Sequence, residues 1–178
     1  MGDVNYPKAY ILYLVEFHGT RDYFECHELL EEYWKEHPGD AYADTWVGLI
    51  QIAVGSYHHR RGNLRGAAKM LRQSLDRLVP QHLAGLGLDG HELIRMVRER
   101  LAGLEVEEPF RDINLPITDE ALRLECEEIC SSRNLVWGAE SPEDQELLHR
   151  HTLRDRSDVI AARAAAAAAK KTRRRQTD

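Results

Sequence analysis

Two residues that could take part in acid–base or metal chemistry lie one helical turn apart in the first third of the chain. His27 and Glu31 are four positions apart, which places both side chains on one face of a helix. An apolar arc on that helix is defined by Phe24, Leu30 and Trp34, and His27 falls at its centre with Glu31 beside it. Burying such groups without partners costs roughly 2–7 kcal/mol. The pattern therefore predicts that both are hydrogen-bonded, ion-paired or metal-bound.

The next helical segment, residues 41–61, offers partners for this pair. Gln51 and His58 share a stripe on it with two valines, Val47 and Val54, and they lie about 10 Å apart along the axis at ~1.5 Å per residue. We expect this stripe to face the preceding helix. The predicted result is one buried polar cluster, made of His27, Glu31, Gln51 and His58.

Two kinds of non-catalytic role fit such a cluster. It can be a buried hydrogen-bond network that sets the register of the two helices. It can also line a pocket for a small polar molecule or for a side chain of a partner. Our main prediction is therefore a non-catalytic binding or interaction module built around a buried His and Glu cluster.

A metal centre is the rival interpretation of the same residues. His27, Glu31 and His58 form a two-histidine, one-carboxylate set suited to a divalent ion such as zinc. Residues 27–31 parallel the H-E-x-x-H zinc signature with a glutamate in the last place, and Glu28 would then be the general base that acts on metal-bound water. The sequence thus leaves a metal-dependent hydrolase open, although that signature has a histidine as its second ligand.

The residues around this cluster resemble a known family. The run Phe24-Glu25-Cys26-His27-Glu28-Leu29-Leu30-Glu31-Glu32-Tyr33-Trp34 is similar to the F-E-x-H-E-x-x-E-x-x-W signature of domain of unknown function 309, a small bacterial and archaeal helical family. A second block of the family is resembled by residues 48–53, Tyr57-His58, Gly62-Asn63 and Gly66-Ala67. The resemblance covers about residues 17–78 and implies a compact helical domain, but no particular activity. Its matching polar positions are Glu25, His27, Glu28, Glu31, Gln51, His58 and Asn63.

The elements that must position these residues are predicted to be helices throughout. Apolar residues recur at helical spacing along most of the chain, whereas alternating strand patterns are hard to find. This spacing predicts an all-α bundle with helices over residues 5–17, 20–37, 41–61, 64–78 and 89–104. Gly62-Asn63 ends one helix and caps the next, so the third and fourth helices should form an antiparallel hairpin.

The chain is predicted to have three parts. Residues 1–104 would form the helical domain with the family-like motif, and residues 105–118, with Pro109 and Pro116, an extended linker. Residues 119–178 would form a helical appendage that ends in a long helix, with eight alanines in residues 161–169, and a basic tail. A contact between two such helices in a homodimer is a hypothesis.

Charge is distributed unevenly over these parts. The whole chain has a formal charge of -6, but residues 159–178 carry six basic side chains and one acidic one. A basic tail suggests association with nucleic acid. The tail has no interleaved aromatic residue to stack on a base, and the acidic body would repel phosphates, so the sequence argues against that partner.

The expected location is the cytoplasm. No run of about 18 apolar residues predicts a membrane span, and the N-terminus lacks the basic start and apolar core of a signal peptide. The three cysteines, Cys26, Cys126 and Cys130, are an odd number on helix-like segments. They are expected to be reduced thiols in semi-buried or core positions, with a metal or redox role for the last two as the alternative.

Overall fold

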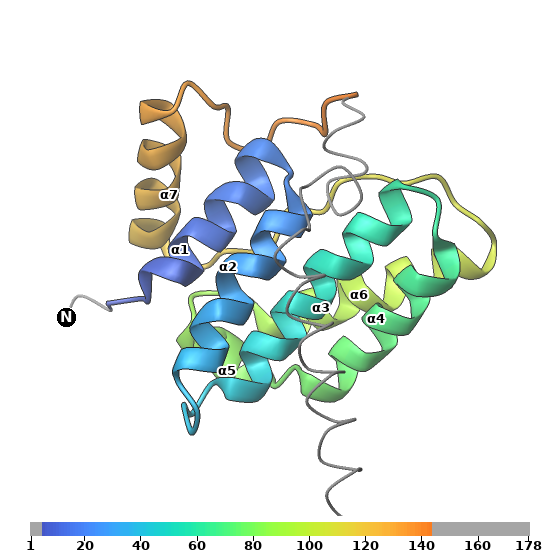
Figure 1. Ribbon diagram of the computed structural model, residues 1–178, viewed down its shortest axis with the longest axis horizontal. Coiled ribbons are helices and arrows are strands. Elements are labelled where there is room, and N and C mark those ends of the chain that lie inside the picture. Colours follow the sequence, from blue (N-terminus) through green and yellow to red (C-terminus); the bar gives the residue numbers. More distant parts are fainter. Residues whose placement is uncertain (1–4, 144–178) are drawn as a thin grey trace, which may run out of the picture. The chain divides into compact units, whose positions relative to one another are not determined.

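The five helices predicted between residues 5 and 104 are present, and a short π-helix and a short α-helix lie between them (Figure 1). The predicted long C-terminal helix lies outside the described residues. The computed structural model describes residues 5–143. The elements are α1 (Lys8–Val15), the π-helix η1 (Glu16–Thr20), α2 (Tyr23–Glu36), α3 (Ala43–Arg60), α4 (Leu64–Arg77), α5 (Pro80–Gly85), α6 (Gly90–Glu105) and α7 (Glu120–Ser132). Over this range strand-like pairing is limited to one isolated bridge between Leu88 and Ile117. The all-α class is therefore confirmed.

Short polar side chains begin four of these helices. Asp22, Asn63, Asp89 and Asp119 each accept a hydrogen bond from the backbone N–H three residues later. Such a cap stabilises a helix by about 1 kcal/mol because it satisfies an otherwise unpaired donor. The cap at Asn63 and a helix that begins near Asp89 were expected from the sequence. The second helix begins later than expected, because residues 16–20 form the π-helix and Arg21 adopts a left-handed conformation with φ 58°.

Helix α3 lies between α2 and α4 in the layer that carries the motif (Figure 1). Two glycines of α3 face the end and the middle of α4. A Cβ atom at Gly48 would lie 2.8 Å from Cδ2 of Leu78, and one at Gly55 would lie 2.9 Å from Cδ2 of Leu71. Both distances are shorter than a normal carbon contact, so a larger residue at either position would force the leucine side chain to shift.

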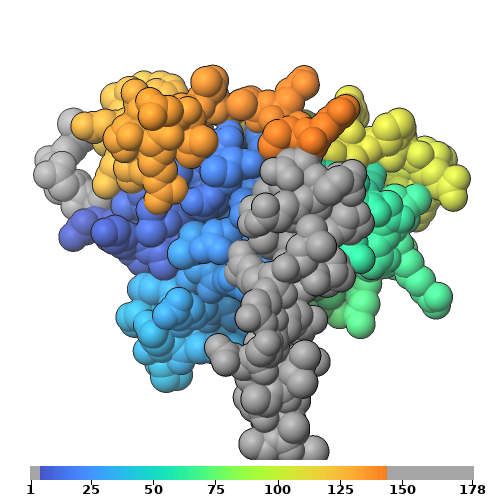
Figure 2. Space-filling model, turned by 45° about the horizontal axis from the view of Figure 1, so that its top comes forward, coloured from blue at the N-terminus to red at the C-terminus, as the bar shows by residue number. Residues whose placement is uncertain are grey.

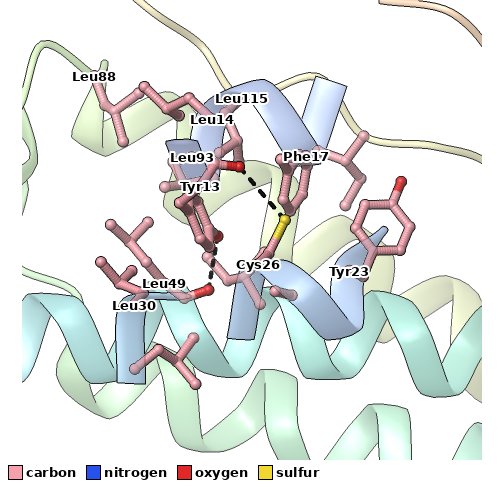
Figure 3. Packing of buried hydrophobic residues seen from close by; sticks show 14 of the residues in the cluster. Tyr13, Leu14, Phe17, Tyr23, Cys26, Leu30, Leu49, Leu88, Leu93 and Leu115 are labelled. Atoms are coloured by element: carbon pink, nitrogen blue, oxygen red, sulfur yellow. Dashed lines mark hydrogen bonds between the residues drawn. The ribbon is translucent and has the colours of Figure 1, made fainter. Parts of the chain in front are cut away.

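The core is centred on α1, as Figure 3 shows for part of it. Tyr10, Tyr13, Leu14 and Phe17 are fully buried, and they pack against α2, α3 and the segment after α6. The Tyr13 hydroxyl donates to the carbonyl of Leu49 over 2.7 Å, so the buried phenol is satisfied. Burial of this much apolar surface is the main stabilising term for the bundle.

The chain after α6 returns to the same core. Ile113 and Leu115 of the connecting segment are buried, and α7 contacts α1 and buries Leu122, Cys126 and Cys130. Figure 2 shows residues 133–143, in orange, running along the molecule beside the blue helices. The division into a domain at 1–104, a linker at 105–118 and an appendage at 119–178 stays a prediction, because residues 144–178, with the alanine-rich segment and the basic tail, lie outside the described residues.

None of the helices within residues 5–143 has both the length and the apolar character that crossing a membrane requires.

Candidate functional site

The predicted His27 and Glu31 pair forms, but at the surface. His27 Nε2 donates to Glu31 Oε2 over 2.6 Å, and Lys35 Nζ donates to the other carboxylate oxygen over 2.8 Å. The side chains of His27 and Glu31 are 24% and 32% exposed. Partial burial acts to raise the pKa of Glu31, but the hydrogen bond from Lys35 and the charge of His27 outweigh it and lower that pKa.

The inward face of α2 is therefore rotated from the predicted one. Its fully buried residues are Tyr23, Cys26 and Leu30, whereas Phe24 and Trp34 are only half-buried. The prediction used Phe24 and Trp34 as core anchors because large aromatic residues are usually buried. Phe24 contacts Tyr57 of α3 from this half-buried position. His27 and Glu31 are half-buried too, so the expectation of a fully buried polar cluster was wrong.

The polar stripe of α3 also lies elsewhere than expected. Val47, Gln51, Val54 and His58 are all half-buried, and they share the side of α3 opposite to its core residue Leu49. One flank of α3 meets α2, where the Trp46 ring contacts Tyr33 at 5.6 Å between centroids. The other flank meets α4 at the two glycines. The stripe therefore lies on the outer surface of the layer formed by α2, α3 and α4. It does not form the interface between α2 and α3.

Aromatic contacts connect the two helices along this surface. The ring centroids of His27 and Phe24 are 5.3 Å apart, those of Phe24 and Tyr57 5.6 Å, and those of Tyr57 and His58 5.8 Å. The two histidines thus lie at the two ends of one row of rings. We call this surface the signature face and define it by Phe24, His27, Glu31, Gln51, Val54 and His58.

The remaining polar partners of the signature face come from α4 and its N-cap. The Asn63 amide contacts His58 Nδ1 at 3.3 Å while its oxygen caps Gly66, and the Gln51 amide donates to Gln73 over 3.3 Å. Partial burial, with a smaller contribution from Arg61, lowers the pKa of His58. The neutral form of His58 is therefore favoured.

Two polar atoms of the signature face are buried without a hydrogen-bond partner among the described residues. They are His27 Nδ1 and Gln51 Oε1. Gln51 Oε1 is an acceptor, whereas His27 Nδ1 is an acceptor in the neutral ring and a donor in the charged ring, because Nε2 holds the proton donated to Glu31. Leaving a buried polar atom unpaired costs about 1–3 kcal/mol.

The metal interpretation requires three ligands around one point. Among residues 5–143, which include all the predicted ligands, no three His, Cys, Asp or Glu side chains are arranged to hold a metal ion. His27 and Glu31 contact each other, whereas His58 contacts Asn63. The structure therefore does not bring the proposed zinc ligands together. Glu28 and Glu25 are half-buried on α2, and within residues 5–143 no metal-bound water is available for which Glu28 could be the general base.

The three thiols lie in the core. Cys26, Cys126 and Cys130 are free and buried, and burial raises the pKa of Cys126 to about 12. A thiol with a raised pKa is a poor nucleophile and a poor metal ligand. This placement favours the packing role that the sequence suggested.

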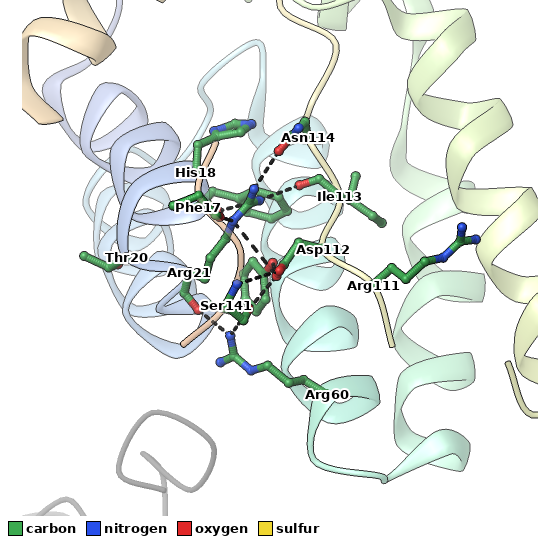
Figure 4. A network of polar contacts seen from close by, with 12 residues as sticks. Phe17, His18, Thr20, Arg21, Arg60, Arg111, Asp112, Ile113, Asn114 and Ser141 are labelled. Atoms are coloured by element: carbon green, nitrogen blue, oxygen red, sulfur yellow. Dashed lines mark hydrogen bonds and ion pairs between the residues drawn. The ribbon is translucent and has the colours of Figure 1, made fainter. Parts of the chain in front are cut away.

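A second polar region, which the sequence did not indicate, lies at the N-terminal end of α2 (Figure 4). Its centre is Arg21, whose side chain is 2% exposed and lies 4.0 Å from Asp112. The guanidinium donates to the carbonyls of Phe17, Ile113 and Ala139 and to the side chain of Asn114. One side chain thus connects the end of η1 to two segments about 92 and 118 positions further along the chain. No local pattern indicates such contacts.

Asp112 is the acidic residue of this region. It accepts hydrogen bonds from the Tyr23 hydroxyl over 2.6 Å and from the Ser141 backbone N–H over 2.7 Å. Arg60 donates to the carbonyl of Arg21 over 2.6 Å and lies over the Tyr23 ring at 4.6 Å. Burial acts to raise the pKa of Asp112, but the hydrogen bonds from Ser141 and Tyr23 and the charge of Arg21 lower it.

His18, one helical turn before Arg21, contacts the same two segments of the chain. Its Nδ1 donates to the carbonyl of Leu14 over 2.8 Å, and its Nε2 accepts from the backbone N–H of Leu115 over 2.9 Å. The ring stacks on Trp137 with 4.3 Å between centroids. Burial lowers the pKa of His18 to about 4. We call the group of His18, Arg21, Tyr23, Arg60, Asp112 and Ser141 the polar latch.

The comparisons with known proteins agree with the sequence pattern. The family described as domain of unknown function (DUF309) matches residues 10–70. The uncharacterized protein YpuF of Bacillus subtilis (strain 168) is 47% identical over 161 residues, which are 89% of this chain and 92% of that protein. An uncharacterized protein of Aquifex aeolicus (strain VF5) is 27% identical over 92 residues, 51% of this chain and 27% of that one. No solved structure matches the chain significantly.

Proposed function

The chain belongs to the DUF309 family, and we propose that it is a non-catalytic interaction module that binds a partner protein through the signature face. The observation that carries this proposal is the position of the family's polar residues. His27, Glu31, Gln51 and His58 lie on one half-exposed surface of two adjacent helices, and His27 Nδ1 and Gln51 Oε1 have no hydrogen-bond partner within residues 5–143.

The fold does not need these residues for its core. The core of the layer is formed by other positions of the same helices, such as Cys26 and Leu30 of α2 and Leu49 and Ile52 of α3. Polar residues that are shared with a family signature yet lie outside the core are typical of binding surfaces. A face built from packed helices suits a partner segment that lies along it.

Site-specific photocrosslinking tests this proposal. A photoreactive phenylalanine analogue at Val54 would probe the signature face, and one at Leu124, which is 53% exposed on α7, is the matched control. The full chain would be expressed in its native host, irradiated, and its adducts identified by mass spectrometry. We expect a discrete adduct with one partner from position 54 that Gln51→Leu weakens, and none from position 124.

Two outcomes contradict the proposal or redirect it. Position 54 giving no adduct, or the same adducts as position 124, would show that the signature face binds no partner protein. An adduct between two copies of the chain would identify the partner as a second copy. The homodimer through the alanine-rich helix and the nucleic-acid association through the tail concern residues outside the described range and stay predictions. Deleting residues 170–178 and measuring salt-dependent binding to DNA and RNA tests the latter.

A further inference from the structure

We infer that a pocket between α6 and the segment that follows it binds a carboxylate group. The pocket has a volume of about 300 Å³, and its walls come from the middle of α6 and from residues 108–114. It shares no residue with the signature face, so the inference is independent of the proposed function. It follows from which charged side chains of the pocket are paired and which are not.

Arg100 is held in this pocket by uncharged partners. Its Nη1 donates to His59 Nδ1 over 3.1 Å, and its Nη2 donates to the carbonyl of Arg111 over 2.5 Å. An arginine can only donate, so Nδ1 accepts and the His59 ring is neutral. The guanidinium also lies over the Phe110 ring at 5.5 Å. These contacts fix the position of Arg100, but none of them neutralises its charge, and it forms no ion pair among the described residues.

Arg111 brings a second guanidinium to the same pocket. It is exposed, and Figure 4 shows its side chain extending away from Asp112. Burial lowers the pKa of Arg100, and the charge of Arg111 adds to this effect, because the two like charges are close together. Arg111 forms no ion pair within residues 5–143. Three other exposed arginines of that range each bind a carboxylate, namely Arg77, Arg95 and Arg133.

Three carboxylates also line the pocket, and two of them are already paired. Glu99 binds Arg95 over 2.8 Å. Asp112 is bound within the polar latch, where Arg21 lies 4.0 Å away. Glu108 is the third, and it forms no ion pair in the described part of the chain. Two unpaired positive charges and one unpaired negative charge leave a surplus of one positive charge, which favours a monoanion over a dianion.

The other walls of the pocket favour a carboxylate with an apolar body. Met96 and Ile113 are apolar lining residues. Asn114 uses its Oδ1 to accept from Arg21 over 2.7 Å, so its NH2 group is the part that can donate to a ligand. A planar carboxylate fits the fork of a guanidinium, and such charged hydrogen bonds are roughly twice as strong as neutral ones. The expected ligand is therefore a carboxylate on a short apolar chain.

NMR titration of the full chain tests the inference. The probe is sodium butanoate, and the matched probes are butanamide, which lacks the charge, butylammonium, which has the opposite charge, and sulfate, which is a dianion. Shifts of the backbone amides of residues 96–114 would be followed at constant ionic strength. We expect saturable shifts with butanoate, at least about tenfold weaker binding of butanamide, weaker binding of sulfate, and no shifts with butylammonium.

A further probe distinguishes two sources of the carboxylate. It is a short alanine peptide with one central glutamate, blocked at both ends. Tighter binding of butanoate than of this peptide would identify a small organic acid as the ligand. Tighter binding of the peptide would identify an acidic side chain of a protein, and both results support the inference.

Three charge variants locate the effect. Arg111→Gln removes an exposed guanidinium of the pocket and should weaken butanoate binding by at least about fivefold. Arg98→Gln makes the same change at an exposed position of α6 outside the pocket and should leave binding unchanged. Glu108→Gln removes the unpaired carboxylate and should tighten binding by about two- to threefold. The amide spectrum of each variant confirms that it is folded.

Three results would overturn the inference. They are equal binding of butanoate and butanamide, tighter binding of sulfate than of butanoate, and an identical effect of Arg111→Gln and Arg98→Gln. None of them changes the adduct expected from position 54, because the pocket and the signature face have no residue in common. The inference and the proposed function therefore fail separately.

Discussion

The signature face and the polar latch differ in how deeply their central residues are buried. In the latch, Arg21 and Asp112 are 2% and 12% exposed, and the donors of Arg21 are taken up by oxygens of η1 and of two distant segments. On the signature face, His27 and Glu31 are 24% and 32% exposed. Both regions hold buried polar atoms without a partner among the described residues, His27 Nδ1 and Gln51 Oε1 on the face and Arg60 Nε and Nη2 in the latch. The difference in burial indicates that Arg21 and Asp112 hold the fold together, whereas the signature face lies at the surface.

The largest expected effect of a substitution is therefore in the latch. Arg21→Ala removes all the hydrogen bonds of the guanidinium and leaves Asp112 without its buried counter-charge, so it should lower the free energy of unfolding by about 3–5 kcal/mol. Urea denaturation followed by circular dichroism measures this change. Arg98→Ala, at an exposed position of α6, should stay within about 0.5 kcal/mol. Equal effects of the two variants would show that Arg21 is not a structural centre.

A second prediction concerns the pH dependence of stability. His18 has a pKa of about 4 in the folded chain and about 6.5 when unfolded, so the unfolded chain binds the proton first as pH falls. The contribution of neutral His18 to the free energy of unfolding is fully present above pH 6.5. It should decrease by on the order of 3 kcal/mol as pH falls to about 4. His18→Gln should remove this part of the pH dependence. Unfolding curves at half-unit steps of pH test it, and parallel profiles of the two proteins would contradict it.

Asp112→Asn should have a smaller effect, of about 1–3 kcal/mol at pH 7, because the amide oxygen can still accept from the Tyr23 hydroxyl, but the amide NH2 cannot accept from the Ser141 backbone N–H and the charge opposite Arg21 is lost. The pKa of Asp112 is lowered by folding, so its contribution is present above the unfolded pKa and is lost as pH falls below it. The variant should therefore show a shallower loss of stability in acid. Asp76→Asn, at an exposed position of α4, is the control. A variant as acid-sensitive as the parent chain would exclude a structural role for this carboxylate.

The smallest effect is expected on the signature face. Gln51→Leu should change the free energy of unfolding by less than about 1 kcal/mol, and in the stabilising direction, because it removes an unpaired buried acceptor at the cost of one long hydrogen bond to Gln73. Differential scanning calorimetry measures the shift in Tm. A loss as large as that of Arg21→Ala would make the face part of the structural core and remove the contrast between the two regions.

Much of the architecture was predictable from local sequence. The cap at Asn63, the α3–α4 turn and the family signature are properties of residues within a few positions of one another. The His27 and Glu31 contact was predictable for the same reason, since four positions make one helical turn. The π-helix that delays the start of α2 was not, because its residues 16–20 have no local pattern that distinguishes it from an α-helix.

Sequence by itself thus determined the helices, their capped ends and the family, because hydrogen bonds and side-chain contacts within a helix extend over only three or four positions. Only the tertiary structure decided which side of α3 faces outward, because α3 is apolar nearly all round and its stripe of Gln51 and His58 is exposed solely by the placement of α2 and α4. It also decided the polar latch. Arg21, Asp112 and Ser141 come from three separate parts of the chain, and their burial is favourable only when all three are in place.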